Sequence, residues 1–503
     1  MQRRLRRRQH ARGDGHRAVQ RCVFDGDRMD RSRPVPQRDA ECAGHANLCL
    51  GVPAMIPRPA SAAVRRNVVA ARGFSLIEIM IALTLGLLLS IGIMSLFNST
   101  SRTNKLQDAL ARLQENGRFA VSQMERDLRM LGAQYCSNTQ GGAAPGTVSP
   151  VVPARAPMVF APDLRLPDSR INSIDGSGNA AAASATVAYA LSPRWFVQGY
   201  SCSSSSCTPT MPTGPGQIPA MGLADGSRVP ASDVLTIRYQ RGTGWPVGMG
   251  ACATPAAAPL TNGTAITLSP QTGDDPISRM QPGLALISDC VNPVVVPISA
   301  VAGNTVMIGT APATSGGILP GALGAVCSGN STRDVRLFNF TDDFVTVSYY
   351  LAFRADNSPD ARPNSAAAQR LIPVLIRREN GVEQELVRGV DQLAFRYGVQ
   401  DAGGNTQFLT AEQVNGAGGC PAPPPGLNLE PGCMWRAVRT IEPHLLLNTV
   451  NEVFGLDNAG RTYRFDGSTF TRADGDALPS GINAGSQLRR EFIAYVSVRD
   501  RHL

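Results

Sequence analysis

An uninterrupted apolar segment, Ile79–Phe97, constrains this chain more than any other feature of its 503 residues. The segment carries no charge, and its 19 residues would span about 28 Å as a helix, close to the thickness of a bilayer core. Arg65, Arg66 and Arg72 precede it, whereas the first charge after it is Arg102. The excess of positive charge before the segment predicts a cytoplasmic N-terminus and an exported body.

The charge of the chain is concentrated before this segment. Residues 1–73 contain 16 Arg, no Lys and six acidic residues, a net charge of +10, so the rest of the chain carries −1 of the total of +9. A nucleic-acid-binding body would need a basic face, so we expect no nucleic-acid partner for it. A hydrophobic content of 43% with 17% charged residues excludes a wholly disordered chain.

We predict that the helix continues beyond the apolar segment into an amphipathic half. An ordinary secretory signal would end here in a small-residue cleavage site. Instead, apolar residues recur at helical spacing: Leu106, Leu110, Leu113, Val121, Met124, Leu128 and Leu131. The intervening charges are expected on the opposite face: Lys105, Asp108, Arg112, Glu115, Arg126 and Asp127. Periodicity alone leaves open a signal anchor followed by a stalk.

The residues that open this helix narrow the choice. The run Arg72-Gly73-Phe74-Ser75-Leu76-Ile77-Glu78 resembles the prepilin peptidase site of type IV pilins and type II secretion pseudopilins. The resemblance implies cleavage between Gly73 and Phe74, N-methylation of Phe74, and assembly into a filament through the helix at 74–132. Residues 1–73 would then be a leader.

Glu78 stands out on physical grounds as well. A carboxylate costs up to about 2.5–3.5 kcal/mol at the membrane centre and less near the interface, so such residues are candidates for function. The α-amine created at Phe74 could pair with Glu78 of the same helix or of an adjacent subunit. The alternative is an interfacial Glu78 that reaches the lipid headgroups.

Further segments resemble the PilW-type minor pilins. The run LQENGRFAVSQMERDLRMLGAQYC (113–136) is similar to the end of their helix, and three C-terminal runs are similar to their strands: 388–399, 435–439 and 489–499. The resemblance implies an α+β, type IV pilin-like fold, in which the long helix packs on an antiparallel sheet. It also implies three partners: a prepilin peptidase, other major and minor pilins, and the inner membrane.

Local patterns predict strands independently of the resemblance. Phe344–Phe353 is β-branched and aromatic, and Leu371–Arg378 and Glu383–Val387 flank an Asn-Gly turn. Residues 492–499 alternate with a period of two. We therefore expect an antiparallel sheet region over 333–503. A β-rich, loop-rich variable region is expected over 133–332, with short strands at 185–191, 234–239, 284–288, 294–298 and 305–308.

Eight cysteines follow residue 73: Cys136, Cys202, Cys207, Cys252, Cys290, Cys327, Cys420 and Cys433. An even number in an exported body predicts disulfides, although free buried thiols remain the alternative. The local pairs Cys202–Cys207 and Cys420–Cys433 are the leading candidates. No Cys-x-x-Cys spacing occurs, and only His444 and His502 follow residue 73, so we expect no metal site.

No catalytic motif is present, so we expect a non-enzymatic protein without a cofactor or a small-molecule substrate, and His444 is expected to be structural. The leading hypothesis is a minor pilin that supports pilus assembly or initiation, twitching motility, adhesion or DNA uptake. The alternatives are a type II secretion pseudopilin and a periplasmic binding protein with a signal anchor.

Residues 1–54 are unlike a normal prepilin leader because they are Arg-rich and lack a periodic apolar face. Translation from Met55 would give an ordinary 19-residue leader, which would make residues 1–54 a start-site artefact. The alternative is a basic cytoplasmic arm that binds acidic lipid or nucleic acid.

Overall fold

The structure is a computed structural model, and it describes residues 75–134, 137–138, 158–159, 189–190, 196–211, 218–248, 263–288, 293–309, 335–358, 361, 363–365, 369–400, 405–416, 434–435, 438–452, 462–471, 482 and 487–498. The chain divides into two units, Met1–Leu76 and Ile77–Leu503. Apart from the first residue of the long helix, every element below belongs to the second unit.

Helix α1 (Leu76–Leu128) is a single element of 53 residues that carries the apolar segment in its first half. It contains no proline, so no helical hydrogen bond is lost to a missing N–H group. The helix ends in a tightened turn, where the N–H groups of Met130 and Leu131 donate to carbonyls three residues earlier. Gly132 follows with a φ of 65°, a left-handed conformation that suits glycine and turns the chain away from the helix.

A six-stranded antiparallel sheet has the strand order β16-β15-β14-β7-β5-β6. Its strands are β5 (Val197–Cys202), β6 (Cys207–Thr208), β7 (Val234–Gln240), β14 (Phe344–Ala355), β15 (Leu371–Glu379) and β16 (Val382–Arg388). The predicted hairpin is confirmed: Asn380 and Gly381 join β15 to β16 with φ angles of 48° and 86°, the positive pair that a type I′ turn requires. Strands β5 and β7 lie before residue 333 and β14 lies after it, so this sheet draws on both ranges.

A five-stranded sheet has the order β18-β17-β19-β22, and β23 also pairs with β19. Its strands are β17 (Val390–Gln400), β18 (Thr406–Leu409), β19 (Val438–Asn448), β22 (Arg489–Ile493) and β23 (Val496–Ser497). The alternation predicted at 492–499 buries Ala494, Val496 and Val498, but the strand is broken after Ile493. The break faces Pro443 of β19, which has no N–H group to donate to the ladder.

A third sheet of eight strands has β4-β3-β11-β10-β13-β8 as its main path, with β12 and β9 continuing from β11. Its strands are β3 (Met158–Val159), β4 (Tyr189–Ala190), β8 (Trp245–Pro246), β9 (Ala265–Thr267), β10 (Gly283–Ser288), β11 (Val294–Ala302), β12 (Thr305–Ile308) and β13 (Arg336–Asn339). It has its own hydrophobic core around Trp245 and Leu337. The strands predicted at 284–288, 294–298 and 305–308 are confirmed as β10, β11 and β12.

Among the described residues, the smaller elements are two hairpins and three short helices. They are β1 (Ala133–Gln134) with β2 (Ser137–Asn138), β20 (Thr462–Phe465) with β21 (Ser468–Thr471), η4 (Ile277–Arg279), α4 (Phe340–Asp343) and α5 (Ala411–Gly416). Helix α4 follows β13 of the eight-stranded sheet directly and leads into β14 of the six-stranded sheet.

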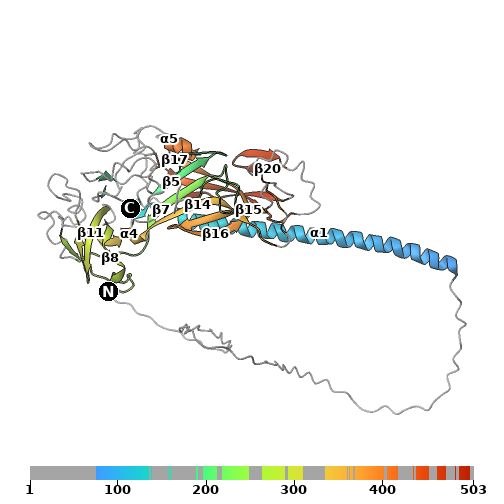
Figure 1. The fold of residues 1–503 in the computed structure, drawn as a ribbon, viewed down its shortest axis with the longest axis horizontal. Coiled ribbons are helices and arrows are strands. Elements are labelled where there is room, and N and C mark those ends of the chain that lie inside the picture. The colour runs from blue at the N-terminus through green and yellow to red at the C-terminus, as the bar shows by residue number, and fades with distance from the viewer. Residues whose placement is uncertain are drawn as a thin grey trace, which may run out of the picture. The chain divides into compact units, whose positions relative to one another are not determined.

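One hydrophobic core joins the second half of α1 to the six-stranded and five-stranded sheets. Met124 and Leu128 of α1 belong to the same buried cluster as Leu375 of β15 and Leu393 and Leu445 of the five-stranded sheet. In Figure 1 the second half of α1 runs beside β14, β15 and β16, while the first half extends beyond the strands. The fold is therefore α+β, with one long N-terminal helix and a large, mainly antiparallel β part, as the sequence predicts.

Candidate assembly surface

The first half of α1 exposes its apolar side chains on every face. The large hydrophobic residues from Leu76 to Phe97 are each between 50% and 77% exposed. The most apolar 18-residue window of the helix has a mean hydropathy of 2.4, and none of it is buried within the protein. A helix of this length and composition can cross a membrane, and so much apolar surface is stable only in a bilayer or against other helices.

Glu78 lies in the first turn of this apolar half, with its side chain exposed. Its neighbours Ile77 and Ile79 are exposed as well. The positive end of the helix dipole favours a carboxylate in the first turn. The predicted cleavage and methylation residues, Gly73 and Phe74, lie outside the described residues, so Glu78 is the one predicted assembly residue that the structure places.

The second half of α1 packs on the body along a stripe at helical spacing. Its buried residues are Leu113, Gly117, Ala120, Met124, Asp127 and Leu128. The predicted apolar face is confirmed, since Leu110 and Val121 also pack against this core. A methyl group at Gly117 would overlap the ring of Phe492 in β22, so the glycine allows the helix to approach the five-stranded sheet closely.

Asp127 lies on the buried face of α1 and not on the solvated face, where its charge predicts it. The residue is only 5% exposed and points into the six-stranded sheet. Its Oδ2 atom accepts hydrogen bonds from Arg377 Nε and from the Tyr349 hydroxyl, both at 2.6 Å, and its Oδ1 atom accepts one from Arg377 Nη2 at 3.2 Å. These partners offset the cost of burying the carboxylate, which would otherwise be prohibitive.

The Asp127–Arg377 ion pair is part of a longer series of ion pairs on the six-stranded sheet. Arg377 Nη1 also contacts Glu379 at 2.6 Å, and Glu379 contacts Arg241 at 2.7 Å. Burial alone would lower the pKa of Arg377, but the hydrogen bonds to Asp127 and Glu379 and the charge of Asp127 raise it. Burial and the charge of Asp127 likewise raise the pKa of Tyr349, so its hydroxyl stays protonated as a donor. This network holds α1 at a fixed register on β14 and β15.

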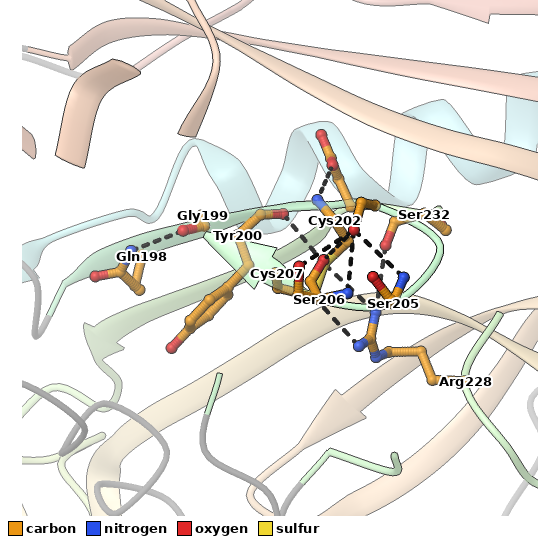
Figure 2. The surroundings of a disulfide bond; sticks show 11 residues. Gln198, Gly199, Tyr200, Cys202, Ser205, Ser206, Cys207, Arg228 and Ser232 are labelled. Atoms are coloured by element: carbon orange, nitrogen blue, oxygen red, sulfur yellow. Dashed lines mark hydrogen bonds between the residues drawn. A yellow bond between two sulfur atoms is a disulfide. The ribbon is translucent and has the colours of Figure 1, made fainter. Parts of the chain in front are cut away.

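A disulfide joins Cys202 at the end of β5 to Cys207 at the start of β6. Figure 2 shows Arg228 directed at this turn, with its guanidinium nitrogens 3.5 Å from Cys202 Sγ and 3.3 Å from Cys207 Sγ. Arg228 is 2% exposed, and burial lowers its pKa to about 10. The remaining candidate cysteines lie outside the described residues: Cys136, Cys252, Cys290, Cys327, Cys420 and Cys433.

A half-buried carboxylate, that of Asp233, supports the same strand end. Asp233 Oδ1 accepts a hydrogen bond from the Cys202 amide at 3.0 Å, and Oδ2 accepts one from the Phe395 amide at 3.2 Å. Burial raises the pKa of Asp233 to about 6 despite these two bonds. Asp233 thereby ties β5 of the six-stranded sheet to β17 of the five-stranded sheet. The sequence does not predict this contact, because both partners of the Asp233 carboxylate are backbone amides.

The described residues contain no group of three or more His, Cys, Asp or Glu side chains arranged to hold a metal ion. His444 is buried in β19, and its Nδ1 atom lies 2.8 Å from Glu491 Oε1 of the neighbouring β22. It therefore bridges two paired strands.

Residues 349–500 match the family model described as type IV pilus-assembly protein W, PilW. The match supports a PilW-type protein of type IV pilus assembly. Its range begins at Tyr349 and includes Arg377, so both side chains that bind Asp127 of α1 belong to the PilW-like part. Comparisons with curated proteins and with solved structures found no match.

Proposed function

We propose that this chain is a minor pilin, a non-enzymatic structural subunit of the type IV pilus. In this proposal the prepilin peptidase cleaves between Gly73 and Phe74 and the new N-terminus is methylated. The mature chain then resides in the inner membrane, with its N-terminus on the cytoplasmic side and its body in the periplasm. From there it joins other pilins in a filament at the cell surface.

One observation carries the proposal. The first half of helix α1 is apolar and wholly exposed. A buried ion pair attaches its second half to the part of the chain that matches PilW. The first half can be covered by a bilayer before assembly and by other apolar helices after it. Such an exchange needs a rigid connection to the body, which the Asp127–Arg377 contact supplies. The match to a pilus-assembly family favours the pilus over a type II secretion filament.

Glu78 has a defined part in this proposal. In a filament core of packed helices, its carboxylate would be removed from water and would need a cationic partner. The α-amine of Phe74 on an adjacent subunit is the group that cleavage would create at this end of the helix. Pairing the two would set the axial register between subunits.

The test compares Glu78→Ala with Thr84→Ala, a control in the same exposed, apolar part of α1. Thr84 donates a hydrogen bond only to the carbonyl of Ile81 within the helix, so its loss should not affect assembly. Removing Glu78 would leave a buried, unpaired ammonium at a cost of about 3–5 kcal/mol, or more than a hundredfold in incorporation. The measurement is the amount of this chain in sheared pili relative to the membrane fraction.

We expect Glu78→Ala to remain in the membrane with a folded body and to disappear from the pili, with Glu78→Asp partly incorporated. Thr84→Ala should match the wild type. Incorporation of Glu78→Ala at the wild-type level would show that Glu78 takes no part in assembly and would remove the proposed register contact.

A further inference from the structure

A groove of about 680 Å³ lies between the middle of α1 and the end of β19. On the helix side its lining runs from Asn98 to Asn116, and on the other side it is formed by Arg388 and residues 448–452. The helix residues recur at spacings of three and four, so the groove follows one face of α1 from the end of the apolar segment towards the body.

Most of the residues that line the groove are of polar type, and together they carry an excess of positive charge. It holds four cationic side chains and two acidic ones, Asp108 and Glu452. Arg112 is paired with Asp108 at 3.1 Å, and Arg388 is paired with Glu385 outside the groove at 3.1 Å. The other two cations, Arg102 and Lys105, form no ion pair with any residue that the structure describes. The groove therefore offers two unneutralised cations at its membrane-proximal end.

The wall opposite the helix is held in place before any ligand binds. The Val450 carbonyl accepts hydrogen bonds from Arg370 Nη2 at 2.6 Å and from Gln487 Nε2 at 2.7 Å. Asn448 Oδ1 accepts from the Val450 amide, and its Nδ2 atom donates to the buried Asp391, each at 2.6 Å. Because this wall is already ordered, it loses little conformational entropy when a ligand binds in the groove.

Arg102 and Lys105 also lie at a defined distance from the end of the apolar segment. At about 1.5 Å per residue, Arg102 follows the end of the apolar segment by about 7.5 Å and Lys105 by about 12 Å. The headgroup layer of one leaflet is about 5–7 Å thick outside the hydrocarbon core. Helical side chains lean towards the N-terminus, which here means towards the membrane, so both cations can reach lipid phosphates.

We propose that this groove binds the headgroup of an anionic phospholipid from the periplasmic leaflet, with Arg102 and Lys105 contacting its phosphate. The inference rests on the proposed function only in placing α1 across the inner membrane. The lining disfavours an apolar helix of a neighbouring subunit, because only Ala109, Leu113 and Val450 present apolar side chains there. A bound lipid would hold the body upright on the membrane, at the height from which α1 enters the filament.

Lipid binding to the full-length chain in detergent can be measured by native mass spectrometry, with phosphatidylglycerol and phosphatidylcholine as probes. The variant is Arg102→Gln with Lys105→Gln. Arg118→Gln with Arg126→Gln is the matched control, because it removes the same charge from exposed positions of α1 outside the groove. At about 1 kcal/mol per cation, the groove variant should bind phosphatidylglycerol about thirtyfold more weakly. The control should bind it as the wild type does.

Three results of the lipid-binding measurement would overturn the inference: an equal loss of phosphatidylglycerol binding in the control variant, equal binding of the two lipids by the wild type, or displacement of the lipid by millimolar inorganic phosphate. The first would indicate unspecific attraction, and the last a site for free anions. Crosslinks from the groove to a neighbouring pilin helix in membranes would also contradict it. The proposed function would fail in a separate measurement, the content of sheared pili, so the two failures are distinguishable.

Discussion

Replacing Asp127 with Ala should weaken the contact between the second half of α1 and the six-stranded sheet. The loss of stability should be larger than that caused by replacing an exposed residue of the helix. The change removes three hydrogen bonds and leaves Arg377 buried, with Glu379 as its remaining partner. Breaking a buried ion pair on one side costs about 3–5 kcal/mol, and the higher helix propensity of Ala returns at most about 0.7 kcal/mol.

This loss of stability can be expressed as a decrease in the melting temperature. With an unfolding entropy of about 2.1 cal/mol/K per residue and a body of roughly 400 residues, it corresponds to about 4–6 °C. The assay is thermal unfolding of the full chain in detergent, followed by the fluorescence of the buried Trp245 and Trp435. The matched control is Asp108→Ala, which breaks an ion pair whose side chains are 75% and 63% exposed and which should shift the melting temperature by less than about 1 °C.

A double variant separates the lost pair from general disruption of the core. Asp127→Leu with Arg377→Met replaces both charges with apolar groups and leaves Glu379 paired with Arg241. Such replacements are often neutral, so the double variant should recover most of the stability that Asp127→Ala loses. If Asp127→Ala melts within 1 °C of Asp108→Ala, the buried pair does not anchor the helix and the reasoning is refuted.

Two other predictions concern the contact between the six-stranded and five-stranded sheets. The pKa of Asp233 is about 6 in the folded protein, against 3.8 for an ordinary aspartate, so its contribution to stability is present below about pH 4 and is lost as the pH rises through 6. Chemical denaturation should show wild-type stability falling by about 2 kcal/mol more than that of Asp233→Asn between pH 4 and pH 7; parallel profiles would contradict this. A methyl group at Gly199 in β5 would overlap the Tyr397 hydroxyl, which has no hydrogen-bond partner among the described groups, so Gly199→Ala should cost about 1–3 kcal/mol. Tyr397→Phe should recover part of that cost in the double variant, and a lack of recovery would place the strain elsewhere.

Much of the fold was predictable because the decisive signals are local. The apolar segment, the helical periodicity that follows it and the Asn-Gly turn between β15 and β16 each depend on residues close in sequence. The break before β23 was not predictable from the alternation of residues 492–499, since it depends on Pro443 in the strand that pairs with them.

The anchoring contact of α1 was missed for the same reason. Asp127 follows Met124 by three residues and precedes Leu131 by four, so it falls on the buried face of the helix, and this spacing was the available signal. The charge of Asp127 predicts the solvated face instead, because the compensating Arg377 lies 250 residues away and leaves no local signal. A carboxylate at a core position of a helix therefore predicts a distant buried cation, although the pattern does not say which one.

We propose above that the chain enters the pilus as a processed subunit through the apolar half of α1. The most direct test is mass spectrometry of the N-terminal peptide of this chain, recovered from sheared and washed pili. We expect a peptide that begins at Phe74 with a methylated α-amine. Recovery of the chain with residues before Phe74 still attached, or its absence from pili while the membrane holds the processed form, would refute this proposal.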